Sequence, residues 1–264
     1  MCRDLPEQLF MTWTECGIIA GTGAAVGFLS GLLGKGGSAI TTPSLQIFAH
    51  VNPFSALASP LPATLPSTLV ASYAYREQKL VNKRVVMYTV LLGIPPTVAG
   101  SFFSNSFKGN ALMMMTAVFV LVLGLSFFIR PDLPPEPDEL ESQVPFWKLL
   151  LVSTSVGLLS GLLANSGGVL YGPLFIRVFR MPVKNALASS LVVSAILGIP
   201  GTITHWYLGH IDWLIVLILS CSAIPFSYLG ARLALKMENE RLERVFAFML
   251  VLFGAFDLFY SIRH

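Results

Sequence analysis

The sequence predicts an all-α polytopic membrane protein with two repeats, and three observations lead to that fold class. Apolar residues make up 54% of the chain and charged residues only 12%, about half the usual share of charge in soluble domains. Uncharged runs long enough to cross the roughly 30 Å hydrocarbon core of a bilayer recur along the chain. The second half also repeats glycines and prolines of the first half at one constant spacing.

The uncharged runs predict the membrane helices in chain order. They cover residues 17–33, 85–107, 111–129, 185–208 and 211–231, the last with a single charge, Asp212, near its start. Three prolines at 60–66 must disrupt a helix ladder, so we expect this stretch to line a cavity together with Ser59 and Thr64. Ser189 and Ser194 are the counterparts of these two residues in the second half.

Two short apolar pieces each follow a glycine-rich loop. As helices, residues 38–50 and 168–180 would reach only about 20 Å, which is too short for an unaided span. The sequence therefore predicts a broken or re-entrant helix hairpin in each repeat, followed by three further membrane helices. Whether the short pieces are re-entrant or cross the membrane stays open at this point.

An internal duplication brings the two halves into register without a gap at a spacing of 130 residues. GFLSGLLGKGGSAITTP at 27–43 then lies over GLLSGLLANSGGVLYGP at 157–173. Paired glycines and prolines at one constant offset indicate duplication rather than chance. We assign repeat 1 to residues 17–129, an acidic proline-rich linker to 130–145, and repeat 2 to 146–262.

Charge placement favours opposite orientations for the two repeats. If both short pieces return to the side from which they came, the second repeat is inverted and one face collects most basic residues. That face holds Arg76, Lys79, Lys83, Arg84, Arg177, Arg180, Lys184, Arg232, Lys236, Arg241 and Arg244. The positive-inside rule makes this face, with the linker, cytoplasmic, and both termini would lie outside.

The two glycine loops form the candidate binding site. Backbone polar groups at membrane depth are tolerated only where they are buried or line a cavity, and loops entering from opposite faces would meet near the midplane. Free N–H groups at the start of the following helices favour a small anion. The candidate substrate-binding residues are Lys35, Gly36, Gly37, Ser38, Thr41, Thr42, Ser59, Asn165, Ser166, Gly167, Gly168, Tyr171, Ser189 and His205.

A purely structural interpretation stands beside the binding interpretation. The glycines could serve only close helix crossing, and Lys35 could extend to a membrane interface; its counterpart, Asn165, is uncharged. His205 could contact an anion or carry a proton, although a lone histidine near a helix end is more often an interface or packing residue.

Other classes of function find little support. The net charge of +3 is small and scattered, so no nucleic-acid face is expected, and the three cysteines have no spacing typical of disulfides or zinc. GTGAAVG at 21–27 follows no strand, and in GKGGS the lysine is followed by Gly36, where a phosphate loop needs Ser or Thr. Neither a nucleophile with a base nor a metal cluster is apparent, so we expect no enzyme, cofactor or metal. No removable signal peptide is expected either.

The motifs together resemble the sulfite exporter TauE/SafE family, also described as toluene-sulfonate uptake permeases. The resemblance rests on GLLGKGGS and GLLANSGG, each followed by a proline, on the ALAS segments at 56–59 and 186–189, and on LGHIDW at 208–213. It implies a secondary transporter for sulfite, sulfonates or other sulfur-containing organic anions in the plasma membrane.

The leading hypothesis is a multi-pass transporter of the plasma membrane (the bacterial inner membrane). It would move sulfite or organosulfonates by alternating access, with export as the expected direction. The alternative is an anion channel that uses the same two loops. The expected partners are the anionic substrate and the lipid bilayer; a coupled proton or other ion and a homo-oligomer are left open.

Overall fold

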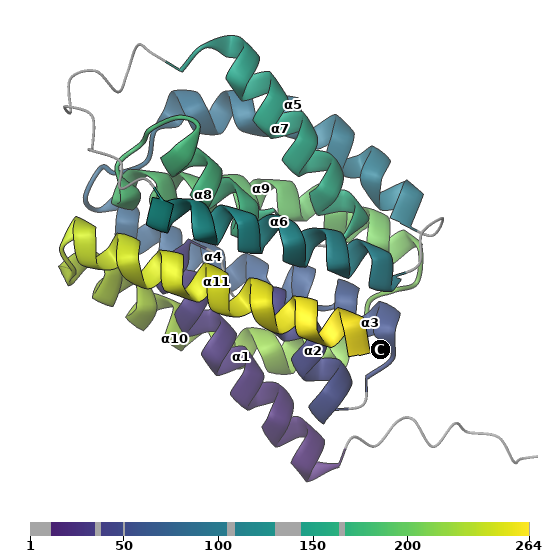
Figure 1. Ribbon diagram of the computed structural model, residues 1–264. Coiled ribbons are helices and arrows are strands. Elements are labelled where there is room, and N and C mark those ends of the chain that lie inside the picture. Colours follow the sequence, from purple (N-terminus) through teal and green to yellow (C-terminus); the bar gives the residue numbers. More distant parts are fainter. Residues whose placement is uncertain are drawn as a thin grey trace, which may run out of the picture.

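The computed structural model describes residues 12–34, 38–49, 51–104, 109–129, 144–163 and 167–263. Every regular element within these ranges is a helix, as the sequence predicts (Figure 1). The helices are α1 (Trp13–Leu33), α2 (Ser38–Phe48), α3 (Pro53–Ala58), α4 (Pro60–Arg76), α5 (Lys83–Phe103), α6 (Gly109–Ile129), α7 (Phe146–Leu162), α8 (Gly168–Arg177), α9 (Val183–Tyr207), α10 (Trp213–Lys236) and α11 (Asn239–Arg263).

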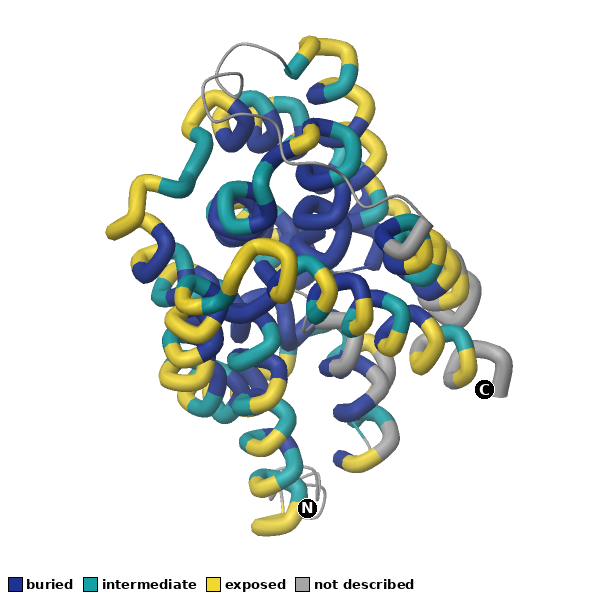
Figure 2. The backbone as a smooth tube through the Cα atoms, turned by 60° about the vertical axis from the view of Figure 1, so that its left-hand side comes forward, coloured by how far each residue is buried: buried dark blue, intermediate teal, exposed yellow. Residues whose placement is uncertain are grey.

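The outer surface of the bundle is apolar, which identifies a membrane protein. Among the described residues, α1, α5, α9 and α10 are long and apolar enough to cross a bilayer. Large side chains such as Leu91 and Leu217 are about three-fifths exposed, and buried residues occupy the interior of the bundle (Figure 2). Soluble monomers rarely expose large contiguous apolar patches, so this surface faces lipid and the chain is a multi-pass membrane protein.

The tightest helix contacts join the two halves of the chain. Helix α1 packs along α10, and α7 packs along α5. A Cβ added to Gly31 would meet the Ser227 carbonyl oxygen, and one added to Gly161 would meet the carbonyl oxygen of Thr97. Small residues allow backbones to approach this closely in membranes, so the glycines do serve helix crossing.

These contacts recur at the spacing of the sequence duplication. Gly161 and Gly31 are 130 residues apart, as are Ser227 and Thr97. Two hydrogen bonds match in the same way (Figure 1 shows the helices concerned). The Asn82 N–H donates to Ser189 Oγ at 3.0 Å, and the Asp212 N–H donates to Ser59 Oγ at 2.9 Å. Asn82 and Asp212 each also cap the helix that follows them.

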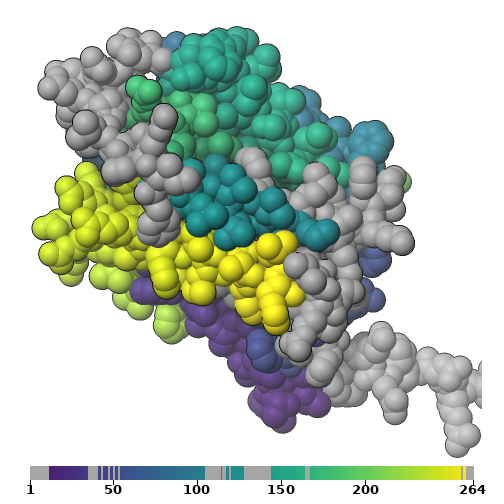
Figure 3. All heavy atoms as spheres, in the orientation of Figure 1, coloured from purple at the N-terminus to yellow at the C-terminus, as the bar shows by residue number. Residues whose placement is uncertain are grey.

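Helices α6 and α11 lie side by side and run antiparallel (Figures 1 and 3). A Cβ added to Gly124 would meet Val251, and one added to Gly254 would meet Leu121. The sequence duplication relates these two helices, since α11 begins 130 residues after α6. Helices α6 and α11 occupy equivalent positions in the two repeats and contact each other antiparallel. This arrangement fits a pseudo-twofold axis that is perpendicular to the two helices.

The two short pieces are separate short helices, as the sequence predicts. Helix α2 has 11 residues and α8 has 10, or about 15 Å each. Gly34 ends α1 with a φ of 66°, and Gly167 precedes α8 with a φ of 71°. Both glycines occupy the left-handed region that side chains with a Cβ rarely adopt.

The break in the proline-rich stretch lies at Ser59, which ends α3 and precedes α4. Helix α4 then continues through Pro62 and Pro66. Pro60 and Pro62 fall in the first turn, where backbone N–H groups have no helical acceptor, so only Pro66 removes a hydrogen bond from the ladder. In the second half, α9 runs without a corresponding break over 25 residues.

Three loops with basic residues meet at one end of the bundle. Arg232 lies 3.4 Å from Glu77. Asn185 Nδ2 donates to the Leu80 carbonyl oxygen at 3.1 Å, and Lys184 Nζ donates to the Leu235 carbonyl oxygen at 3.1 Å. The connections α4–α5, α8–α9 and α10–α11 therefore share one end, as the charge pattern predicts.

Candidate functional site

The centre of each glycine loop falls outside the described residues. This applies to Lys35, Gly36, Gly37, Asn165 and Ser166, and to the side chain of Ser38. The segments that flank these loops are described. They show which helices surround the two predicted binding loops.

The start of the first loop is held between α4 and α9. Tyr75 of α4 donates its hydroxyl to the Gly31 carbonyl oxygen at 3.2 Å. Ser190 of α9 donates to the Gly34 carbonyl oxygen at 3.3 Å, and a Cβ on Gly34 would lie 2.8 Å from Ser190 Oγ. The backbone therefore enters the first loop directly against α9.

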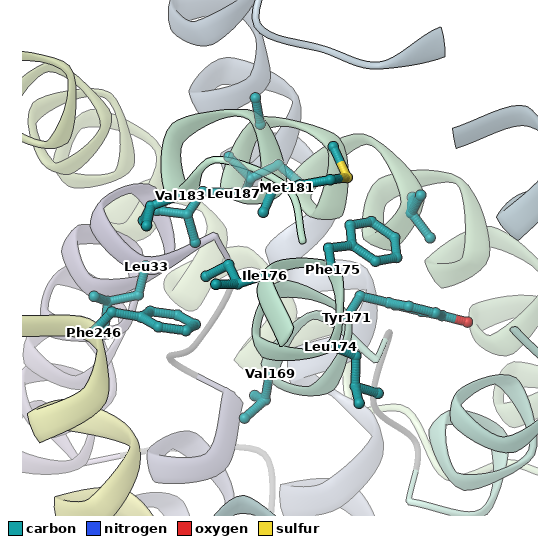
Figure 4. Close-up of a cluster of buried hydrophobic side chains, with 14 of the residues drawn as sticks. Leu33, Val169, Tyr171, Leu174, Phe175, Ile176, Met181, Val183, Leu187 and Phe246 are labelled. Atoms are coloured by element: carbon teal, nitrogen blue, oxygen red, sulfur yellow. The ribbon is translucent and has the colours of Figure 1, made fainter. Parts of the chain in front are cut away.

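Tyr171 of α8 packs against Gly167, the described end of the second loop. A Cβ on Gly167 would lie 2.7 Å from the Tyr171 ring, and one on Gly93 would lie 3.3 Å from the Tyr171 hydroxyl. Tyr171 is fully buried, and its hydroxyl has no hydrogen-bond partner. In Figure 4 that hydroxyl points away from the apolar cluster containing Phe175 and Ile176.

The predicted threonines of the first loop are also buried. Thr41 is 1% exposed and Thr42 is 8% exposed on α2. Thr41 is the positional counterpart of Tyr171. Gly168, at the start of α8, is buried as well.

Ser59 and Ser189 have a structural task in addition to any contact with substrate. Ser59 Oγ accepts the Asp212 N–H before α10, and Ser189 Oγ accepts the Asn82 N–H before α5. Both serines are fully buried. The structure places them against different loops and does not bring them together.

His205 lies in the interior of the bundle, at 1% exposure. Its Nε2 is 3.3 Å from the Gly161 carbonyl oxygen, and its Nδ1 is 3.3 Å from Nδ1 of His210. Because a carbonyl oxygen only accepts, Nε2 carries the hydrogen and Nδ1 accepts from His210. Tyr75 reaches the Gly31 carbonyl oxygen at the equivalent place in the first half. This environment fits the packing interpretation of His205.

Two further buried hydroxyl residues were not predicted from the sequence. Thr89 of α5 and Ser153 of α7 are fully buried, and their hydroxyls have no partner. Their sequence signal is weak, because single hydroxyl residues are common in apolar helices. Among the described residues, His, Cys, Asp and Glu form no group that could hold a metal ion.

Comparison with known proteins relates the chain to one protein family and to several membrane transporter proteins. A family model described as "Sulfite exporter TauE/SafE" matches residues 19–256. A probable membrane transporter protein of Bacillus subtilis (strain 168), YunE, is 25% identical over 93% of this chain and 96% of its own length. A probable membrane transporter protein of Xylella fastidiosa (strain 9a5c) is 27% identical over 91% of this chain and 94% of its own length.

A third relative, from Haemophilus influenzae, has the same description. It is 26% identical over 87% of this chain and 92% of its own length. No solved structure matches this chain.

Proposed function

Because this chain belongs to the sulfite exporter TauE/SafE family, we propose that it is a secondary transporter of small sulfur-containing anions. Sulfite and organosulfonates are the proposed substrates, and export by alternating access is the proposed mode. The multi-pass helical bundle and the membrane transporters among its relatives support the class of function.

The observation that carries the proposal is the pair of interrupted helices. Helix α1 ends at Leu33 and α2 begins at Ser38, while α7 ends at Leu162 and α8 begins at Gly168. Interrupted segments at corresponding places in two halves are typical of transporter binding sites. The N-terminal ends of α2 and α8 would present backbone N–H groups to an anion.

We assign opposite membrane orientations to the two repeats, 17–129 and 146–262. The antiparallel contact between α6 and α11 supports this assignment, since an axis that relates antiparallel spanning helices lies in the membrane plane. The meeting of the basic loops at one end supports a cytoplasmic location for that end. The 130–145 linker would then be cytoplasmic.

Flux measurements in proteoliposomes test the proposal. A carrier should give sulfite or sulfonate uptake that saturates with concentration and that accelerates when the same anion is trapped on the opposite side. A channel, the alternative function, would give conductance without this counterflow. A chain that moves none of these anions in either assay would contradict the proposed substrate class.

A further inference from the structure

Four buried hydroxyls without hydrogen-bond partners lie on four helices beside the two glycine loops. They belong to Thr89 of α5, Ser153 of α7, Tyr171 of α8 and Ser194 of α9, and we call them the hydroxyl layer. Each of the four residues is fully buried. A buried hydroxyl that lacks a partner costs roughly 1–3 kcal/mol, so four in one region need an explanation.

The register of α5 and α7 places Thr89 and Ser153 at one level. A Cβ on Gly157 would lie 2.8 Å from the Gly93 carbonyl oxygen, and Gly161 faces Thr97 in the next turn. The two helices therefore run parallel with a fixed offset. One turn earlier, the same offset pairs Thr89 with Ser153.

Helices α8 and α9 bring the other two hydroxyls to the same region. A Cβ on Gly93 would lie 3.3 Å from the Tyr171 hydroxyl and 3.1 Å from Leu197 of α9. Ser194 precedes Leu197 by three residues, and Thr89 precedes Gly93 by four, so both are about one turn away. The four hydroxyls therefore lie within about one helical turn of Gly93.

The hydroxyl layer is adjacent to both loops. Ser194 lies one turn beyond Ser190, which donates to the Gly34 carbonyl oxygen before the first loop. The Tyr171 ring packs against Gly167 after the second loop. The hydroxyl layer therefore lies next to the described ends of both loops.

The matched positions on the helices that the duplication relates to α5, α7 and α9, which are α10, α1 and α4, do not repeat this chemistry. The counterparts of Thr89 and Ser153 are Leu219 and Gly23. The counterpart of Ser194 is Thr64, whose hydroxyl donates to the Leu61 carbonyl oxygen at 3.1 Å. The duplication therefore gives similar backbones, while the matched positions on α10, α1 and α4 offer no unpaired hydroxyl.

We propose that the hydroxyl layer binds the sulfo group of a monoanionic substrate, an inference that rests on the proposed transport of sulfur-containing anions. Three sulfonate oxygens can accept hydrogen bonds from four hydroxyl donors. The layer itself has no charge, and the cost of burying an ion rises steeply with its own charge. A sulfonate with one negative charge should therefore be preferred over sulfate with two, although the two groups are nearly equal in size.

The test measures binding of methanesulfonate and sulfate to the full chain in lipid nanodiscs by calorimetry, with thermal unfolding measured in parallel. The unchanged protein should bind methanesulfonate at least roughly tenfold more tightly than sulfate. Tyr171→Phe, Thr89→Val and Ser194→Ala should each weaken methanesulfonate binding by about tenfold, as the loss of one hydrogen bond to an anion implies. These variants should unfold no more easily than the unchanged protein, since the deleted hydroxyls have no protein partner.

Matched controls remove buried hydroxyls that do have partners. Tyr75→Phe loses the bond to the Gly31 carbonyl oxygen, Thr68→Val loses the bond to the Thr64 carbonyl oxygen, and Ser101→Ala loses the bond to the Thr97 carbonyl oxygen. Thr68→Val and Ser101→Ala should keep methanesulfonate affinity within about twofold. Tyr75→Phe serves as the control for stability alone, because Tyr75 holds the start of the first loop, and it should unfold at a lower temperature.

Different negative results would distinguish an error in the hydroxyl-layer proposal from an error in the proposed substrate class. Normal methanesulfonate affinity in all folded layer variants would overturn the hydroxyl layer as a subsite and leave the substrate class intact. Sulfate binding as tight as methanesulfonate binding would overturn the preference for a monoanion. An unchanged protein that binds neither probe would overturn the proposed substrate class, and the subsite with it.

Discussion

At the scale of single residues, the two halves match more closely in position than in chemistry. Tyr75 and His205 occupy equivalent places and reach equivalent glycine carbonyl oxygens through different side chains. Lys35 and Asn165 are another such pair, with a charge in only one half. The duplication therefore preserves backbone placement more closely than side-chain chemistry.

Replacing Lys35 tests whether a full positive charge contributes to anion binding. Lys35→Met keeps the apolar stem and removes the ammonium, so loss of a charge-assisted hydrogen bond should weaken sulfonate binding by roughly 1.5–3 kcal/mol. This corresponds to about one to two decades in the dissociation constant, measurable by calorimetry. An effect below about twofold in the folded variant would mean that Lys35 extends to an interface and that backbone N–H groups hold the anion.

His210 should make the stability of the protein depend on pH. It stacks on Phe54 with ring centroids 5.0 Å apart, and partial burial lowers the pKa of its imidazole below 6.5. The folded state then binds the proton less readily than the unfolded state, so stability falls as the pH drops through 6.5 toward the folded pKa.

The measurement compares unfolding temperatures at about pH 7.5 and 5.5. The unchanged protein should lose stability on acidification, and His210→Phe, which keeps the stacked ring, should show a smaller loss. Equal pH dependence in both proteins would show that His210 is not the source of the effect.

Sequence reasoning predicted only part of the candidate site, for reasons visible in single residues. The loops and Tyr171 were predicted because glycine interruptions in apolar sequence are conspicuous. Thr89 and Ser153 were not, because their importance depends on the register of α5 against α7, which composition does not determine. The bond from Ser59 to Asp212 was equally hidden, since the two residues are distant in the chain.

At the scale of helices, length was predictable and pairing was not. The apolar runs predicted the bounds of α1, α5, α6, α9 and α10 to within a few residues, because the thickness of the bilayer sets the length of a spanning helix. Which helices pair depends on the shapes of their surfaces. The sequence did show glycines in α1 at four-residue spacing, but not that they face α10.

The glycines of α1 allow a test of that pairing within one helix. Gly31→Ala should destabilise the protein by about 1–3 kcal/mol, because the added methyl would meet the Ser227 carbonyl oxygen of α10. Gly21→Ala is the matched control. A Cβ there meets nothing within 4 Å, so it should be neutral or stabilising by up to about 1 kcal/mol through helix propensity. Denaturant unfolding of the two variants gives both values, and equal stabilities would argue against the α1–α10 crossing.

At the scale of the whole molecule, the halves are interlocked rather than stacked as separate units. Helix α1 finds its closest partner in α10 and α7 finds its closest partner in α5, so each half completes the other. A relative motion of the halves would have to move whole cross-half pairs or separate these glycine contacts. The backbone clashes expected at Gly31 and Gly161 favour movement of intact pairs over separation.

Cysteine labelling tests the orientation of the whole bundle, in a background in which Cys2, Cys16 and Cys221 are replaced. Gln78 lies in the α4–α5 connection and Glu238 in the α10–α11 connection, and both are exposed. If the repeats have opposite orientations, Gln78→Cys and Glu238→Cys should both react with a membrane-impermeant maleimide only after the cytoplasmic side is opened, because positive loops stay inside.

The matched position for that experiment is Trp13, which is 95% exposed at the start of α1. Helix α1 runs parallel to α10, because Gly23, Gly27 and Gly31 meet successive turns of α10 in the same order. Helix α10 ends at the basic loops, so the start of α1 lies at the opposite end of the bundle. Trp13→Cys should therefore react in intact cells. If Gln78→Cys and Glu238→Cys reacted from opposite sides, their loops could not meet as Arg232 and Glu77 do, and the inverted arrangement would be wrong.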